Sequence, residues 1–142
     1  MNYGPKTVTN GLVLCLDAAD KNSYPVSGTT WRDLSGNAYN GTLTNGPTFN
    51  ASNMGSIALD GTNDYIYRSS ISNFNSSTYT VLLWAKFNSM STYGILFSLG
   101  RSASDAATEA QLQQANSKLV YWDYDSSMGF NFIQSAGTLS TN

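Results

Sequence analysis

The chain has 142 residues, enough for one domain with a buried core, and it carries a formal net charge of −2 with 11% charged residues. Its seven cations are scattered rather than clustered, so we expect no nucleic-acid partner and no membrane insertion. Ser, Thr and Asn together make up about a third of the chain, which favours strands and tight turns over helices.

The chain contains no histidine and one cysteine, Cys15. An intrachain disulfide, a zinc site and a Ser-His-Asp or Cys-His catalytic arrangement are therefore excluded. Cys15 lies in the apolar run 12–16, which is too short to span a bilayer and lacks the features of a signal peptide. We expect a buried, inert thiol at this position.

Short apolar or alternating runs, with turn residues about every ten positions, predict many strands. The step Asn116-Ser117 predicts a tight hairpin turn between two of them. Residues 104–114 fit either one turn of helix or a strand. In chain order, we expect strands at residues 11–16, 56–59, 64–68, 78–87, 94–99, 110–116, 118–124 and 129–134.

Residues 78–87 give the clearest strand pattern in the chain. On one face of this predicted strand, Trp84 is either a core residue of a second layer or a platform for a sugar ring. The opposite face is expected in the core and consists of Tyr79, Val81, Leu83, Ala85 and Phe87.

Because no convincing amphipathic helix separates the strands, we predict an all-β, antiparallel two-sheet β-sandwich or jelly roll in a single domain, residues 1–142. The small residues of 135–142 end the chain without another strand. A sandwich of this kind normally has several more strands. We therefore expect either that C-terminal strands are missing or that the sheet is completed by a partner.

Three motifs occur in a fixed order. The first is Trp-x-Asp-x-Ser-Gly-Asn-x-x-x-Gly at residues 31–41, the second covers residues 59–66 and the third residues 79–84. This ordered set resembles the laminin-G-like modules of the concanavalin A-like lectin/glucanase superfamily over about residues 10 to 100. Residues 9–18 look like the start of such modules in tailed-phage structural and adhesion proteins. The family's later Trp-x-His strand and Asp-Gly hairpin are missing, in keeping with an incomplete jelly roll.

The resemblance implies a structural calcium ion. Asp33, Ser35 and Asn37 place oxygen atoms at alternate positions of one glycine-containing loop, and Asp60 and Asp64 bracket a second glycine turn. Ca²⁺ prefers six to eight oxygen ligands, which two such loops could supply together. In the alternative interpretation, Asp33, Asn37 and Asp60 only bond to their own backbone in Asx-turns, and no ion is bound. The candidate metal ligands are Asp33, Asn37, Asp60 and Asp64.

Sugar binding on such folds uses aromatic rings with nearby amides or carboxylates. In the predicted strand at 118–124, Trp122 and Tyr124 share a face with Val120 and are expected in the core. Tyr121 and Asp123 then face a ligand or solvent. The candidate carbohydrate-binding residues are Trp84, Arg101, Tyr121 and Asp123.

We do not expect an enzyme. Glu109 is the only glutamate, whereas glucanases of this fold use paired glutamates. Asp123 and Asp125 would lie roughly 7 Å apart, nearer to inverting than to retaining geometry, but nothing in the sequence raises the pKa of either one. Glycoside hydrolysis is thus the less favoured alternative.

The sequence predicts a non-catalytic carbohydrate-binding or adhesion module on a virion surface or tail, or otherwise outside the cell. Its expected partners are a glycan or cell-surface polysaccharide and other virion subunits. The alternative from another functional class is a purely structural virion protein without a glycan ligand.

Overall fold

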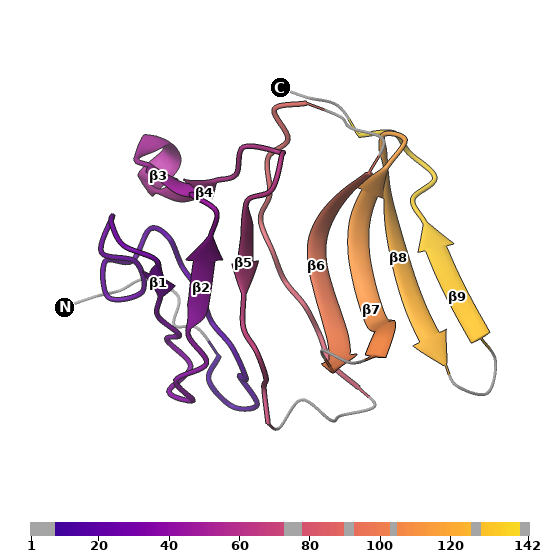
Figure 1. Ribbon diagram of the computed structural model, residues 1–142, viewed down its shortest axis with the longest axis horizontal. Helices are drawn as coiled ribbons and strands as arrows, with labels where there is room; N and C mark the ends of the chain where they lie inside the picture. The colour runs from indigo at the N-terminus through magenta and orange to yellow at the C-terminus, as the bar shows by residue number, and fades with distance from the viewer. Residues whose placement is uncertain (1–7, 73–77, 90–92, 103–104, 126–128, 140–142) are drawn as a thin grey trace. The chain divides into compact units, whose positions relative to one another are not determined.

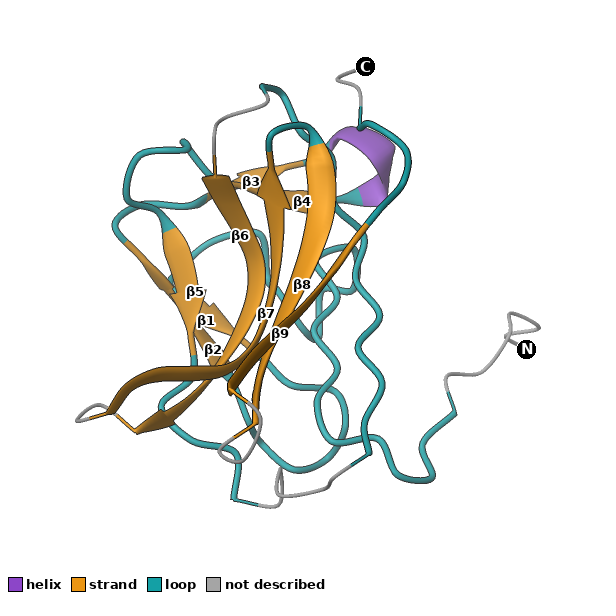
Figure 2. Cartoon of the chain, turned by 90° about the vertical axis from the view of Figure 1, so that its right-hand side faces the viewer, coloured by secondary structure: helices purple, strands orange, loops and turns teal. Residues whose placement is uncertain are grey.

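Strands make up nearly all of the regular structure in the computed structural model of the chain (Figures 1 and 2). Among the described residues, nine strands form three antiparallel sheets, and the helical content is the short 3-10 turn Ser52–Met54. This confirms the prediction of an all-β chain with antiparallel sheets. The structure describes residues 8–72, 78–89, 93–102, 105–125 and 129–139, and only the backbone of residues 93, 101–102, 105–111, 122–125 and 129–133.

The chain forms two compact units, Met1–Tyr79 and Thr80–Asn142. The first unit contains a three-stranded sheet in the order β1-β2-β5 and a two-stranded sheet of β3 and β4, and the second contains a four-stranded sheet in the order β6-β7-β8-β9. A single domain over the whole chain stays a prediction. The strands are β1 Thr30–Trp31, β2 Gly41–Thr44, β3 Thr48–Asn50, β4 Ser56–Ala58, β5 Tyr65–Tyr67, β6 Tyr93–Ser102, β7 Asp105–Ala115, β8 Lys118–Asp125 and β9 Gly129–Gln134.

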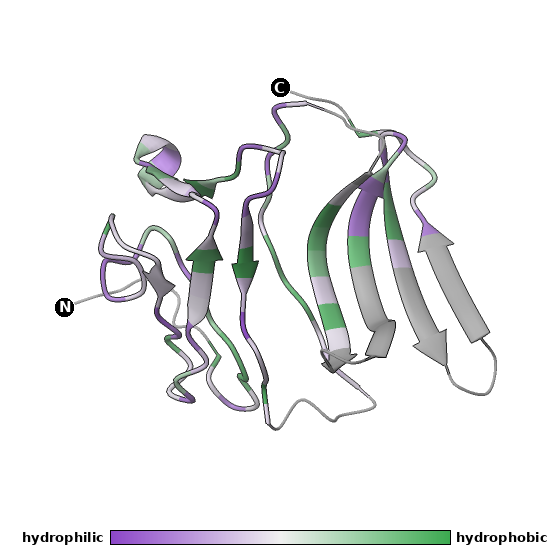
Figure 3. Cartoon of the chain, viewed as in Figure 1, coloured by the Kyte–Doolittle hydropathy of each residue, from purple (hydrophilic) through white to green (hydrophobic). Residues whose placement is uncertain are grey.

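One face of the β1-β2-β5 sheet is apolar. Trp31 pairs with Gly41 and Leu43 pairs with Ile66, and residues directly opposite each other in an antiparallel pair share a face. Leu43 is only 3% exposed. A Cβ atom on Gly41 would lie 3.0 Å from Cγ2 of Ile66, so glycine permits this close packing. Figure 3 shows hydrophobic residues within both β2 and β5.

Aromatic packing holds the loop before β1 against β1 and β3. Tyr24 is 2% exposed, and its ring centroid lies 6.5 Å from that of Trp31 and 6.0 Å from that of Phe49. The Tyr24 hydroxyl donates a hydrogen bond of 2.7 Å to the carbonyl of Gly28. The ring is thus buried while its polar end is satisfied.

In the sheet of the second unit, each strand from β6 to β9 pairs antiparallel with the next strand along the chain. Asn116 and Ser117 form the predicted hairpin turn between β7 and β8, with φ of 50° and 61°. Both values match a type I′ turn, which suits the twist of the two strands. From Asp105 onward, the residues that fitted either helix or strand form β7.

The predicted strand at residues 11–16 is wrong. Leu12 N–H donates to the Thr9 carbonyl in a turn, and Cys15 N–H donates to the Asp33 carboxylate. The Cys15 carbonyl accepts from Leu34 N–H. The backbone N–H and carbonyl groups of this segment therefore bond within a turn and to the loop after β1, rather than to a neighbouring strand.

The predicted strand at residues 78–87 is also absent, because these residues belong to none of the three sheets. Its expected core face is only partly covered, since Val81 is 40% exposed and Ala85 is exposed. Alternation gives the segment strand-like side-chain spacing, but a strand also needs a hydrogen-bonded neighbour. No strand among the described residues pairs with residues 80–87.

Candidate functional site

The loop between β1 and β2 is organised around the carboxylate of Asp33. Its Oδ1 atom accepts hydrogen bonds from the backbone N–H groups of Cys15 and Ser35, both 2.9 Å long. Its Oδ2 atom accepts from the Ser35 hydroxyl at 2.6 Å and from Tyr39 N–H at 3.0 Å. Asp33 N–H donates to Oδ1 of Asn40 at 3.0 Å. The carboxylate thus joins three backbone segments.

Asn37 connects the same loop to the N-terminal segment. Its Nδ2 atom donates to the carbonyls of Val13 and Leu12, at 3.0 and 3.2 Å. This is a different role from the predicted one, because the side chain uses its amide hydrogens rather than offering its oxygen to an ion. We name the group of Asp33, Ser35 and Asn37, with the backbone that they bind, the Asp33 network.

Hydrogen bonding controls the protonation of Asp33. Burial raises its pKa, but the bonds from the Ser35 hydroxyl and from the N–H groups of Cys15, Ser35 and Tyr39 together outweigh burial, and the pKa lies below the ordinary value for aspartate. A pKa lowered on folding stabilises the folded state above the unfolded-state pKa, and this contribution is lost as the pH falls through the folded-state pKa.

We therefore expect the free energy of unfolding to stay level from pH 7 to pH 5 and to fall below about pH 4. Urea unfolding at stepped pH measures this. Asp33→Asn should have a flatter profile than the wild type below about pH 4, because residue 33 can no longer take up a proton. Parallel profiles of the two proteins would contradict the assignment to Asp33.

The thiol of Cys15 is half-buried rather than fully buried. Burial raises its pKa, and the negative charges of Asp17, Asp33 and Asp20 raise it further. Both effects favour the neutral thiol over the thiolate.

The second predicted loop follows β4. Asp60 Oδ1 accepts from the N–H groups of Thr62 at 2.8 Å and Asn63 at 3.3 Å, which is the Asx-turn of the alternative interpretation. The bond from Thr62 is the largest cause of the lowered pKa of Asp60. Asp64 Oδ2 accepts from Asp60 N–H at 3.0 Å, whereas Asp64 Oδ1 is buried and has no hydrogen-bond partner in the part of the chain that the structure describes.

The structure does not bring the four predicted calcium ligands together. The Asp33 network contacts Asn40, just before β2, whereas the second loop contacts Asn45, just after β2, through a 2.7 Å bond from Asn45 Nδ2 to the Asn63 carbonyl. These two ends of β2 lie about 16 Å apart at roughly 3.3 Å per residue.

In both loops, carboxylate oxygens accept hydrogen bonds from the chain itself. Both oxygens of Asp33 accept hydrogen bonds from donors of the chain itself. In the second loop, Asp64 Oδ1 has no hydrogen-bond partner among the described residues. No group of three acidic, histidine or cysteine residues gathers in the part of the chain that the structure describes.

The predicted carbohydrate-binding residues all lie in the second unit, on β6, on β8 and on the segment before β6. Trp84 is 94% exposed in the segment outside the sheets. Tyr121 lies in β8 opposite Leu112 of β7 and is half-buried. Arg101 of β6 and Asp123 of β8 have side chains outside the described ones.

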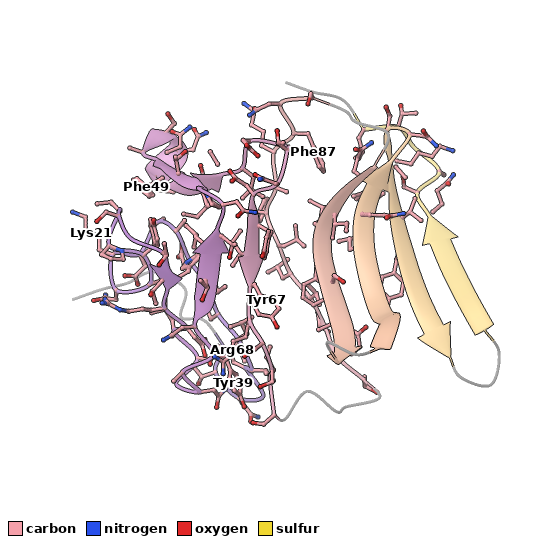
Figure 4. The ribbon with its side chains drawn as sticks, in the orientation of Figure 1. Lys21, Tyr39, Phe49, Tyr67, Arg68 and Phe87 are labelled. Atoms are coloured by element: carbon pink, nitrogen blue, oxygen red, sulfur yellow. The ribbon has the colours of Figure 1, made fainter. Side chains whose placement is uncertain are left out.

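The faces of β8 agree in part with the sequence prediction. Val120 is 4% exposed, as expected for a core position. The side chains of its neighbours on that face, Trp122 and Tyr124, lie outside those described, as does the side chain of Asp125. Sequence reasoning did not single out Tyr39 and Arg68 of the first unit, whose ring and guanidinium group lie together (Figure 4).

No family model matches the chain, and no curated protein matches it. Among solved structures, the chain is similar to a 2.1 Å crystal structure of residues 221–444 of an S-layer domain-containing protein from Clostridium thermocellum ATCC 27405. The two are 22% identical with a TM-score of 0.66, and the match covers 80% of this chain and 53% of the other. The chain thus spans about half the length of that structure. This likeness concerns the fold alone.

The described residues contain no helix with the length and apolar character needed to cross a bilayer.

Proposed function

We propose that the chain is a non-catalytic carbohydrate-binding or adhesion module, built on a two-sheet sandwich of the concanavalin A-like class. The observation that carries this proposal is the 94% exposure of Trp84. The flat apolar face of an exposed indole suits stacking against the apolar face of a pyranose ring. The lack of histidine and of a second glutamate favours binding over catalysis.

A glycan array of the purified chain, read with and without a calcium chelator, tests this proposal. Trp84→Ala should lower the affinity for any bound glycan about tenfold, because the stacking face is lost. Leu82→Ala is the matched control, since Leu82 is 83% exposed in the same segment but has no ring, and it should leave the affinity unchanged. Equal losses in both variants would contradict stacking on Trp84. Loss of binding on chelation would support the calcium ion, which we retain as a proposal.

A purely structural role in a virus particle is the second candidate. The observation that favours it is that Leu82 and Trp84, two residues apart, are both exposed, as in surfaces that pack against another subunit. If that role is correct, the array shows no binding, and light scattering shows assembly that both Leu82→Ala and Trp84→Ala weaken.

We also propose a location outside the cell or on a virion, with a cell-surface polysaccharide or other virion subunits as partners. The similar solved structure belongs to an S-layer domain-containing protein, and this name supports a surface location. Immunogold labelling of the organism or particle that produces the chain tests it. Label confined to the cell interior would contradict it.

A further inference from the structure

The side chain of Arg68 is held in place just after β5. Its Cζ atom lies 5.4 Å from the centroid of the Tyr39 ring, within the range of a cation–π contact. Its Nε atom donates a hydrogen bond of 3.0 Å to the Ser70 carbonyl. Figure 4 shows the labelled side chains of Tyr39 and Arg68 next to each other. Two contacts therefore restrict the guanidinium group before any ligand arrives.

Tyr39 is itself fixed at both ends. Its backbone N–H donates to Asp33 Oδ2 at 3.0 Å, and its hydroxyl lies 2.7 Å from the hydroxyl of Ser72. In a pair of bonded hydroxyls, one hydrogen lies between the two oxygens and the other remains able to donate outward. The Asp33 network thus positions an aromatic ring, and that ring positions Arg68.

None of the described acidic side chains forms an ion pair with Arg68. Within the described residues, its interactions are the ring contact and the Nε bond, so Nη1 and Nη2 make no hydrogen bond and no carboxylate neutralises the charge. This is notable in a chain with a net charge of −2. A restrained guanidinium fork with both terminal nitrogens open is complementary in charge and shape to a planar carboxylate.

We propose that Arg68 binds the carboxylate of an acidic sugar unit through Nη1 and Nη2. The hydroxyl pair of Tyr39 and Ser72 donates its remaining hydrogen to a sugar oxygen. The inference rests on the proposed function, because it assigns an acidic polysaccharide as the ligand class. It places this subsite in the first unit, whereas Trp84 belongs to the second.

Affinity electrophoresis of the full chain in gels containing polygalacturonate or neutral dextran tests the proposal. We expect wild-type protein to be retarded by polygalacturonate, and Arg68→Gln to weaken that binding roughly tenfold to a hundredfold. Arg32→Gln is the matched control, since it removes an exposed positive charge elsewhere in the first unit and should change the affinity less than twofold, within about the effect of a surface charge.

Arg68→Lys keeps the charge without the planar fork and should bind polygalacturonate less tightly than the wild type. Because the side chain is exposed, both Arg68 variants should melt close to the wild type, which separates a binding role from a structural one. Equal losses in Arg68→Gln and Arg32→Gln would overturn the proposal, because they would indicate general charge attraction. Attachment to vesicles of an anionic phospholipid without binding to polygalacturonate would also overturn it.

The failure of this inference is distinguishable from that of the proposed function. If neutral glycans bind in a Trp84-dependent way while polygalacturonate does not bind, only the Arg68 subsite is overturned. If no polysaccharide of either kind binds, the carbohydrate-binding function is overturned together with the subsite.

Discussion

Replacing Asp33 with alanine is expected to lower the free energy of unfolding by about 3 kcal/mol. The substitution leaves the N–H groups of Cys15, Ser35 and Tyr39 without their acceptor, together with the Ser35 hydroxyl. Each donor that loses its acceptor would cost about 1–3 kcal/mol if no water replaced the acceptor. Water reaches part of this loop, however, and lowers the total cost. Urea unfolding at pH 7 measures the loss.

Asp17→Ala provides the control for this prediction. Asp17 also closes an Asx-turn, but its carboxylate accepts one bond, of 2.9 Å from Ala19 N–H, in an exposed turn. We expect its replacement to cost less than about 1 kcal/mol. If Asp17→Ala and Asp33→Ala destabilised the protein equally, the Asp33 network would not be the feature that holds the N-terminal segment to the β1-β2 loop.

Gly55→Ala is expected to have the second large effect, a loss of about 3 kcal/mol. Gly55 has φ of 130°, a conformation that side chains rarely adopt. A Cβ atom there would lie 2.9 Å from the Ala18 carbonyl oxygen and 3.1 Å from Cε2 of Phe49. Both backbone strain and steric overlap therefore oppose the substitution, and chemical denaturation measures their combined cost.

Gly61→Ala separates these two causes. Gly61 has φ of 75°, but nothing lies within 4 Å of the position that a Cβ atom would take. Strain alone should cost about 1–2 kcal/mol. A loss in Gly55→Ala no greater than that in Gly61→Ala would show that the turn containing Ala18 does not pack tightly on Gly55.

Local patterns predicted one pair of strands together with the turn that joins them. β7 and β8 alternate polar and apolar residues and are joined by Asn116 and Ser117, so both the strands and their pairing follow from one short stretch. Residues 78–87 show an equally clear alternation, yet they form no strand, because pairing depends on a neighbour that the pattern does not specify. The sequence patterns did not predict β2. This strand is rich in threonine and glycine, and it pairs with β5 more than twenty residues away.

The same distinction holds for the candidate site. The Asx-turn bonds of Asp33 and Asp60 to residues two positions later follow from the residue types alone. The bond from Cys15 to Asp33 spans 18 residues, and the contact between Tyr39 and Arg68 spans still more. No periodicity in the sequence indicates such contacts. The two loops named in the calcium prediction contact opposite ends of β2, and the residue types do not indicate this placement.

The most direct test of the account is incubation of the full chain with a glycan array, followed by mass spectrometry of the glycans that it retains. A non-catalytic binding module predicts that at least one class of glycan is retained and recovered at its original mass. Retention of no glycan, or recovery of shortened chains, would contradict the account.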